Sequence, residues 1–377
     1  LVLARAGLPL DPYFSASKLG WIMQHVPQAA VLAAQGHLRL GTTDAFFRDR
    51  LTGRFETDVA TASRISLMNL ETGVWDAELC DLFGVPIGCL PAIGPTSGDL
   101  GVLPGGAVLA ASIVDQQAAL YGHGCHRPGA AKVTFGTGAF VQCLTGPLVR
   151  PERPGPLPTV AWQKAGEPVT YALDGGVYSA ASAVNWARGL GLFQGYAEIS
   201  SFLAPPAVDR GIVFVPSLAG LGSPHWNRAA RGAWLGLGLG DGKPDMMQAL
   251  LEGVALRTAE VLAAMQALVA FDGPISVDGG LSRNGYFVQF LSEVAGHDLF
   301  LADEAEQTAV GLASMAAEHF GIPRPYVRSG RRMPAVDTQH VARLRTFAAA
   351  RRAIENFADR NSLQGAGEAA HAIDVSA

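Results

Sequence analysis

Residues 111–124, ASIVDQQAALYGHG, join an apolar run to a helix-like segment through Asp115, Gln116 and Gln117. The preceding residues 106–114 are small and apolar and predict a buried strand. A carboxylate directly after such a strand stands where open α/β sheets bind ligands, and it can accept a proton or hold a divalent metal. The same carboxylate is suited to cap the helix that follows. The local pattern favours the cap and leaves a reacting centre open.

The rest of the chain repeats this alternation of strand-like and helix-like runs, with glycines and prolines between them. Apolar residues recur three and four positions apart in a helix that begins near Ser15 and in residues 244–268. Residues 42–53, which end at Gly53, predict a short helix, and residues 308–321 predict a core helix. The segments 169–191 and 274–296 each suggest a strand, a glycine turn and a helix, and 130–146 suggest a hairpin. Such alternation is typical of an α/β fold.

Composition excludes several classes of protein. Hydrophobic residues make up 49% of the 377 positions and charged residues 16%, which is incompatible with a disordered chain. The net charge is −5 and no arginine stripe occurs, so neither nucleic acid nor a membrane surface is an expected partner. No apolar run reaches the roughly 18 residues of a membrane helix. Four cysteines without CxxC spacing fit reduced thiols in a cytoplasmic protein: Cys80, Cys89, Cys125 and Cys143.

Three glycine-rich turns are candidate phosphate sites. The turn FGTG, residues 135–138, presents backbone N–H groups and a hydroxyl to a phosphate, although a plain hairpin turn explains it equally simply. VDGGLSRN, residues 277–284, places a glycine pair between a strand and a helix, as in a nucleotide crevice or an ordinary tight turn. Residues 173–185 have the same form. GLGLGDG, residues 236–242, lacks the full dinucleotide spacing and predicts a loop.

Aromatic side chains suggest where a small ligand would lie. Tyr13, Phe140 and Trp226 are suited to line a polyol or sugar site, although aromatic residues belong more often to the core. The nine histidines form no HxH or HExxH arrangement, and no GxSxG motif occurs. A metal hydrolase and an α/β-hydrolase therefore lack support.

The motifs DPYFSASK, TDVATASR, DQQAALYG, FGTGAF, LDGGVYSAASAVNW, VPSLAGLGSPHW and VDGGLSRN follow one another in this order. In this order the chain resembles the FGGY carbohydrate kinases over about residues 5–325, and most closely the members that phosphorylate glycerol. The resemblance implies two ribonuclease-H-like domains of the actin and hexokinase type, with ATP and a small polyol in the cleft between them. We place the expected regions at 1–122 (the rest of the polyol-side domain), 123–350 (the nucleotide-side domain) and 351–377 (a fraying tail).

The same resemblance implies roles for individual residues. Asp115 would be the catalytic base and a metal ligand, and it would line the polyol site together with Tyr13, Gln116 and Phe140. The ATP contacts would come from the two groups Gly136, Thr137, Gly138 and Ala181, Asn185, Gly280, Asn284. The reaction would be in-line transfer of the γ-phosphoryl group of ATP to a primary hydroxyl, with Mg²⁺ spreading the charge.

The chain also departs from the family pattern. Val114, Ala181 and Asn185 stand where the family usually has Gly, Gly and Gln. An early DxGTT hairpin and a following RE pair are not found, so we expect that a segment on the order of a hundred residues of the first domain is absent. Family members are often dimers or tetramers, so a homodimer or homotetramer is expected. The alternatives are a kinase for another polyol or sugar, of the xylulose or erythritol type, and a truncated, non-catalytic nucleotide-binding homologue.

Overall fold

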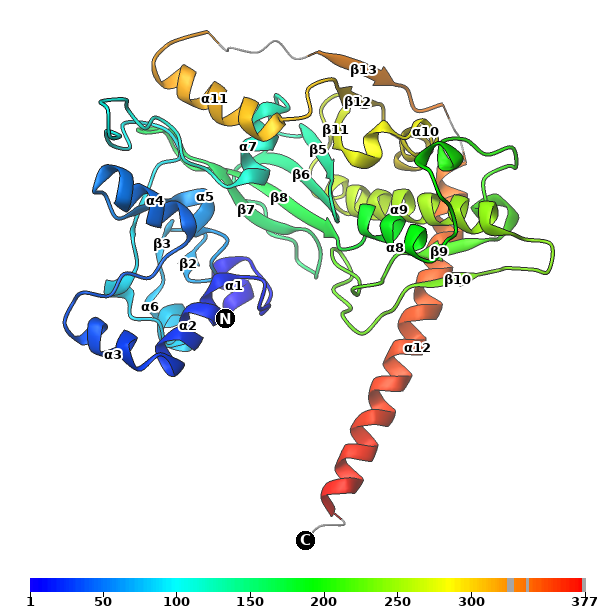
Figure 1. Cartoon of the computed structure of the whole chain (residues 1–377), viewed down its shortest axis with the longest axis horizontal. Coiled ribbons are helices and arrows are strands. Elements are labelled where there is room, and N and C mark those ends of the chain that lie inside the picture. Colours follow the sequence, from blue (N-terminus) through cyan, green and yellow to red (C-terminus); the bar gives the residue numbers. More distant parts are fainter. Residues whose placement is uncertain (324–328, 337–338, 375–377) are drawn as a thin grey trace.

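A seven-stranded sheet forms the centre of the larger lobe in the computed structural model, which describes residues 1–323, 329–336 and 339–374, with side chains to residue 360. The predicted hairpin is β5 (Ala131–Phe135) and β6 (Ala139–Gly146), which pair in antiparallel fashion. On the β6 side follow β8 (Thr170–Val177) and β7 (Leu157–Trp162). On the β5 side lie β11 (Ile275–Gly279), β12 (Leu299–Ala302) and the edge strand β13 (Gly330–Met333). Strands β11 and β12 run parallel to β5 (Figure 1).

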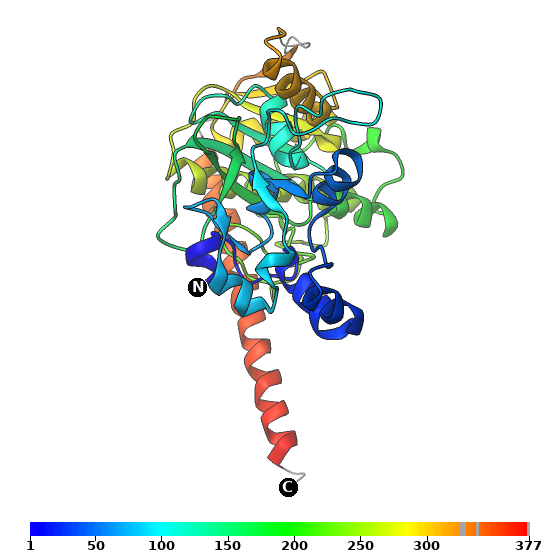
Figure 2. The same cartoon turned by 90° about the vertical axis from the view of Figure 1, so that its left-hand side faces the viewer.

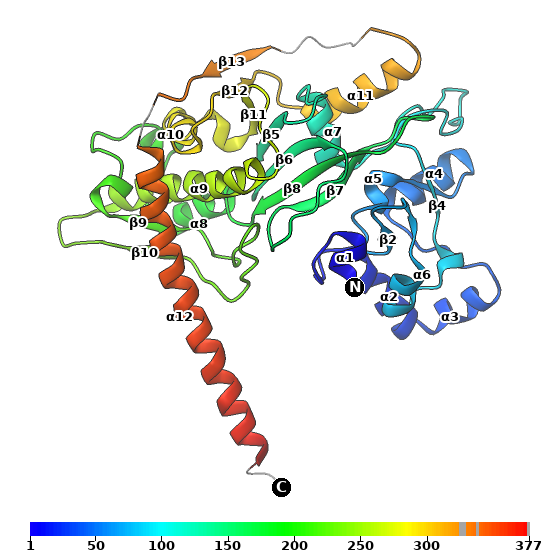
Figure 3. The same cartoon turned by 180° about the vertical axis from the view of Figure 1, so that it is seen from behind.

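The two faces of this sheet differ in polarity because side chains alternate along each strand. On β5, Val133 and Phe135 enter a large apolar core, whereas Lys132 and Thr134 stand on the other face. Helices α8 (Ala181–Gly189), α9 (Lys243–Gln266) and α10 (Gly285–Ala295) contribute to the apolar core. Helices α7 (Asp115–Gly122) and α11 (Gln307–His319) lie beside the more polar face (Figures 1 and 3).

The N-terminal residues form a smaller lobe of short helices beside β7 (Figure 3). Its core contains Leu8, Leu19, Ile65, Leu67 and Leu79. Its strands form two separate pairs, β1 (Glu56–Asp58) with β4 (Ala92–Gly94) and β2 (Met68–Asn69) with β3 (Val74–Trp75). Its helices are α1 (Val2–Ala6), α2 (Ser15–His25), α3 (Pro27–Ala34), α4 (Thr43–Thr52), α5 (Val59–Ala62) and α6 (Ala77–Phe83).

The C-terminal part of the larger lobe adds a short hairpin and a long helix. Strands β9 (Val213–Val215) and β10 (Ala233–Leu235) pair in antiparallel fashion, and the predicted loop at 236–242 lies outside regular strands and helices. Helix α12 (His340–Asp374) extends beyond the lobe (Figures 1 and 2). Residues 351–374, where a frayed tail was expected, are therefore helical, and residues 375–377 lie outside the described residues.

The predicted strand at residues 106–114 was wrong. Gly105 and Gly106 adopt positive φ angles of 101° and 89°, and they form a tight turn that folds the segment back on itself. Only isolated bridges form there, from Val108 to Val102 and from Ala111 to Ser97. The apolar run is thus an irregular connection, and Asp115 follows a loop instead of a strand end.

Close backbone contact joins α7 to α11. A Cβ atom added at Gly122 would lie 2.1 Å from the carbonyl oxygen of Gln307, and one added at Gly311 would lie 1.8 Å from that of Ala118. Only glycine permits such an approach. Although α7 precedes the boundary that we place near residue 123, it packs against a helix of the larger lobe.

Replacing Gly311 with alanine tests this contact. We expect Gly311→Ala to lower the free energy of unfolding by about 1–3 kcal/mol, because the added methyl group forces the two helices apart. The matched control is Gly189→Ala in α8, where an added Cβ has nothing within 4 Å, and which we expect to stay within about 0.5 kcal/mol of wild type or to gain stability. Urea unfolding of both variants measures the difference, and equal stabilities would contradict the contact.

Candidate active site

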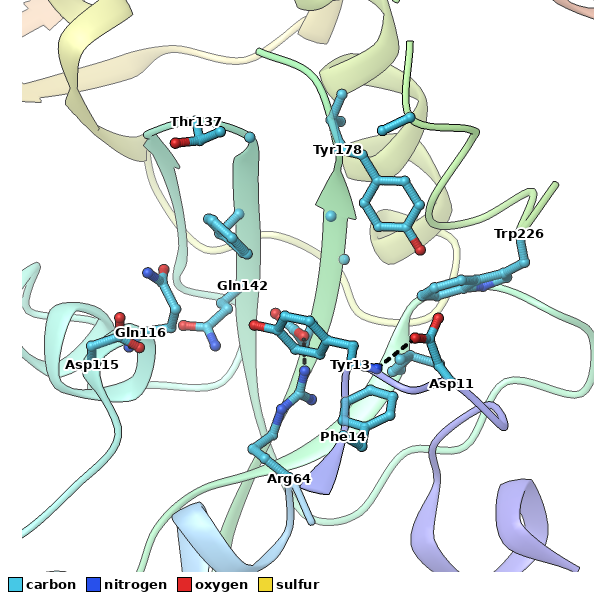
Figure 4. A pocket seen from close by; sticks show the side chains of 18 of the residues that line it. Asp11, Tyr13, Phe14, Arg64, Asp115, Gln116, Thr137, Gln142, Tyr178 and Trp226 are labelled. Carbon is cyan, nitrogen blue, oxygen red and sulfur yellow. Dashed lines mark hydrogen bonds and ion pairs between the residues drawn. The ribbon is translucent and has the colours of Figure 1, made fainter. Parts of the chain in front are cut away.

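A cavity of about 780 Å³ lies between the smaller lobe and the polar face of the sheet. The smaller lobe contributes Asp11, Tyr13, Phe14 and Arg64. The Tyr13 ring points toward Gln142 of β6, whereas Asp11 lies beside Trp226 (Figure 4). The larger lobe contributes residues from α7, from the 135–138 turn, from β8 and from the loop that contains Trp226. The structure therefore brings together segments that are more than 200 positions apart in the sequence.

Asp115 is the first residue of α7, and its carboxylate is exposed at the cavity. The residue at the N-cap position is Val114, and no side chain caps the helix, so the cap favoured by the local pattern was wrong. The Oδ1 atom of Asp115 accepts a hydrogen bond from the backbone N–H of Gln116 at 2.7 Å. Val114 has φ −67°, a conformation open to any residue, so the family's glycine is not required there.

A buried lysine of β5 holds the Gln116 side chain in place. Lys132 Nζ donates to Gln116 Oε1 at 2.6 Å and to Thr134 Oγ1 at 3.0 Å, and the Lys132 side chain is fully buried. Burial lowers the pKa of Lys132 to about 8, although the carboxylates of Asp278 and Asp174 oppose this shift. The lysine thus fixes the amide next to Asp115, so that the Gln116 NH₂ group remains available to a ligand in the cavity.

A second polar contact anchors the other end of α7. His123, which follows the helix, approaches Asp278 of β11 with 3.2 Å between Nε2 and Oδ2. Its Nδ1 atom lies 2.7 Å from the hydroxyl of Ser276 on the same strand. Both ends of α7 are therefore tied to the polar face of the sheet, which limits the positions that Asp115 can adopt.

The predicted acceptor-site aromatics meet in the same cavity. Tyr13 is 68% exposed, and its backbone N–H donates to Asp11 Oδ1 at 2.8 Å. Phe140 extends from β6, and the Trp226 indole N–H donates to the carbonyl of Gly155 at 2.8 Å. The structure thus brings Tyr13, Phe140 and Trp226 together with Asp115 and Gln116.

The Gly136–Gly138 turn docks on the start of α8. The carbonyl of Thr137 accepts hydrogen bonds from the N–H groups of Ala180 at 3.0 Å and Ser182 at 3.1 Å, and the Gly136 carbonyl accepts from Ala181 at 3.2 Å. Thr137 and Gly138 line the cavity, and the turn is held by its carbonyl groups. A phosphate-binding role for Gly136, Thr137 and Gly138 stays a prediction.

The residues predicted to hold the nucleoside lie outside this cavity. Asn185 and Asn284 flank the short 3-10 helix η2 (Tyr196–Ile199). The Tyr196 hydroxyl donates to Asn185 Oδ1 at 2.9 Å, and Asn284 Nδ2 donates to the Ile199 carbonyl at 2.8 Å. Asn284 also caps α10, because its Oδ1 accepts from the Phe287 N–H at 3.0 Å. Both amides therefore have structural partners, and a nucleoside-binding role for Ala181, Asn185, Gly280 and Asn284 stays a prediction.

Several cavity residues were not predicted as site residues. Two ion pairs cross between the lobes, Arg64 with Asp174 at 2.9 Å and Arg228 with Asp11 at 2.6 Å. Gln142 lies on β6 and faces the cavity near Tyr13 (Figure 4). The sequence did contain a signal for these residues, because a polar residue interrupts an otherwise apolar strand at each position. That signal identifies Gln142 and Asp174 as site residues only when the pairing of their strands is known.

The described residues contain no cluster of three or more His, Cys, Asp or Glu side chains that could hold a metal. Mg²⁺ commonly uses one or two protein carboxylates together with substrate phosphates. The exposed carboxylate of Asp115 near the Thr137 turn fits that mode of binding. Among the described helices, none combines the length and the apolar character that crossing a bilayer demands.

The fold and the cleft define a two-lobed sugar kinase. Glycerol kinase from Plasmodium falciparum, solved with ADP, superimposes on 94% of this chain and 74% of its own with a TM-score of 0.84 and 25% identity. Xylulose kinase from Rhodospirillum rubrum shares the fold over 95% of this chain and 75% of its own, with a TM-score of 0.82 and 23% identity.

Comparison of sequences identifies the family. Residues 2–113 match the N-terminal domain and residues 131–319 the C-terminal domain of the FGGY family of carbohydrate kinases. Glycerol kinase of Bdellovibrio bacteriovorus is 39% identical over 85% of this chain, and that of Alkalilimnicola ehrlichii is 40% identical over 84%. The chain belongs to the FGGY family, and it spans about two thirds of the length of these relatives: 67% and 66%. The predicted family and fold class are confirmed.

The buried charge of Lys132 predicts a pH dependence of stability. The pKa of Lys132 is about 8 in the folded protein, whereas the ordinary value for an exposed lysine is 10.5. Between pH 8 and pH 10.5, therefore, the lysine is protonated in the unfolded chain and largely neutral in the folded protein. The unfolded state then binds more protons, and stability rises with pH. Relative to Lys132→Met, the free energy of unfolding of wild type should rise by roughly 3 kcal/mol across this window. Urea unfolding at several pH values checks this, and a constant difference would contradict a buried ammonium group.

Proposed function

We propose that this protein transfers the γ-phosphoryl group of ATP to a primary hydroxyl of a small polyol, with glycerol as the preferred acceptor. The observation that carries the proposal is the meeting of Asp115, Gln116, Tyr13 and Phe140 with the Thr137–Gly138 turn in one cavity. The glycerol kinases near 40% identity support glycerol, whereas the likeness to xylulose kinase at 23% identity concerns the fold alone.

In this mechanism Asp115 accepts the proton of the attacking hydroxyl as the new bond to phosphorus forms. Its place at the first position of α7, with both ends of the helix tied to the sheet, limits the movement of the backbone that carries the carboxylate. Gln116, whose Oε1 is bonded to Lys132, presents its NH₂ group to a hydroxyl oxygen of the acceptor. Positioning of this kind supplies most of the rate enhancement in phosphoryl transfer.

The turn at residues 136–138 lies where the phosphates would be bound. Backbone N–H groups of a glycine turn suit phosphate oxygens, and the Thr137 hydroxyl adds another donor. Asp115, together with the phosphates, would hold Mg²⁺, and the bound ion would supply positive charge to stabilise the transferred group. The aromatic rings of Tyr13 and Phe140 would exclude water, which otherwise competes as the phosphoryl acceptor.

Replacing Asp115 tests the base. We expect Asp115→Asn to lower glycerol-dependent ADP formation by about 10²–10⁴-fold, because an amide cannot accept the proton. Thermal stability should be unchanged, since the residue is exposed and the amide oxygen can still accept from Gln116 N–H. Asp99→Asn is the control, because Asp99 is exposed and lies outside the cavity.

Unchanged turnover in Asp115→Asn would exclude the base role. A wild type that binds ATP without turnover on glycerol, xylulose or erythritol would favour the non-catalytic alternative.

Two glycines test the nucleotide side. A Cβ added at Gly136 would have only the Gly138 carbonyl nearby, at 3.9 Å, and one added at Gly280 would have nothing within 4 Å. Packing therefore does not require glycine at either place, whereas close approach of a phosphate or nucleoside would. We expect Gly136→Ala and Gly280→Ala to unfold within about 0.5 kcal/mol of wild type and to bind a non-hydrolysable ATP analogue more weakly by calorimetry.

The matched control for these variants is Gly88→Ala. Gly88 is exposed in the smaller lobe, and an added Cβ there also has nothing within 4 Å. Its affinity for the analogue should equal that of wild type. Wild-type affinity in both Gly136→Ala and Gly280→Ala would remove these turns from the ATP site.

A further inference from the structure

Gln142 is a buried amide in the wall of the cavity. It lies on β6, its side chain is among those that line the cavity, and only 1% of the residue is exposed. Its Oε1 atom has no hydrogen-bond partner among the described residues. Figure 4 shows Gln142 between Gln116 of α7 and Arg64 of the smaller lobe.

The register of the sheet explains why the Gln142 Oε1 atom has no hydrogen-bond partner in the part of the chain that the structure describes. Gln142 stands directly opposite Lys132 of β5 on one side and Asp174 of β8 on the other. The Lys132 ammonium group donates to Gln116 and Thr134, and the Asp174 carboxylate pairs with Arg64 at 2.9 Å. Both charged neighbours of Gln142 across the sheet therefore bind other side chains, and neither donates a hydrogen bond to the Gln142 Oε1 atom.

A buried polar atom without a partner destabilises the folded state, and nearly all such atoms in proteins have one. Leu144, two positions from Gln142 on the same face of β6, is buried in an apolar cluster, so this face of the strand accommodates an apolar side chain. An apolar side chain of similar shape at position 142 would avoid the cost. The amide becomes useful when a bound molecule supplies its missing partner, and a hydroxyl, which both donates and accepts, matches both ends of an amide.

We propose that Gln142 binds a hydroxyl of the acceptor polyol other than the one that is phosphorylated, and that it thereby determines which polyols are accepted. This inference rests on the proposed function, because it assumes that the acceptor occupies this cavity. Asp115 and Gln116 approach the acceptor from the start of α7, whereas Gln142 approaches it from the sheet. The acceptor is then held by hydrogen bonds from two directions, which a single primary alcohol could not satisfy.

The experiment compares Gln142→Met, which keeps the shape of the side chain and removes the amide, with wild type. Calorimetry measures binding of glycerol, propane-1,2-diol and propane-1,3-diol, and a thermal melt measures the stability of the free protein. We expect Gln142→Met to melt at a higher temperature and to bind glycerol about tenfold more weakly. At least one diol should bind wild type about tenfold more weakly than glycerol and should lose nothing further in the variant.

Gln307→Met is the matched control. Gln307 is also a buried glutamine whose Oε1 lacks a partner, but it lies on α11 and outside the cavity. The affinity of Gln307→Met for glycerol should equal that of wild type. Should Gln142→Met fail to fold, Gln142→Asn retains the amide but withdraws it by one methylene group, and we expect the same loss of affinity.

Two results would overturn the proposal in distinguishable ways. Glycerol binding by Gln142→Met within twofold of wild type would overturn the role of Gln142 and leave the proposed function intact. No binding of any of the three polyols to wild type would overturn the acceptor site itself, and the subsite with it. A glycerol affinity that falls equally in Gln307→Met would show a general effect of removing a buried amide and would also overturn the proposal.

Discussion

The hydrogen bond from Lys132 to Gln116 is the interaction on which the candidate site depends. It joins the centre of the seven-stranded sheet to the first turn of α7, the helix that carries Asp115. Placing an ammonium group in the interior is costly, as the depression of its pKa to about 8 indicates. The ammonium group donates to Gln116 and Thr134, and it thereby orients the Gln116 amide beside Asp115. The folded state thus carries an energetic cost beside the candidate site, which is where strained or costly features tend to occur.

The same face of the sheet also joins the two lobes. Asp174 stands one row position beyond Gln142 and pairs with Arg64 of the smaller lobe, while Arg228 pairs with Asp11 near the mouth of the cavity. These contacts set the separation between Tyr13 on one lobe and Phe140 on the other. Because residues of both lobes line the cavity, a movement of one lobe relative to the other would change its shape. In kinases such closure excludes water from the site of phosphoryl transfer.

Much of the fold could be predicted from local pattern. The helix from Ser15, the end of α4 at Gly53 and the hairpin around Gly136–Gly138 follow from helical periodicity, a left-handed glycine and alternating strands. The strand expected at 106–114 failed because two glycines with positive φ form a turn, and apolar composition cannot distinguish a strand from a buried irregular segment. The prediction that Asp115 is the N-cap residue was wrong by one position, because the N-cap is Val114 and Asp115 is the first helical residue. An error of this size is within the ordinary uncertainty of a helix boundary.

The sequence by itself determined the order of the motifs, the family that this order identifies, and the local turns, because each depends on neighbouring residues. Only the tertiary structure decided where Lys132, Gln142 and Asp174 lie relative to one another. They stand in one row across β5, β6 and β8, and strand pairing alone places them there. Likewise, the meeting of Tyr13 with Asp115 and Trp226 requires the lobes to pack together. Register and packing arise between distant segments, so the partners of a buried polar group are not apparent from the residues on either side of it.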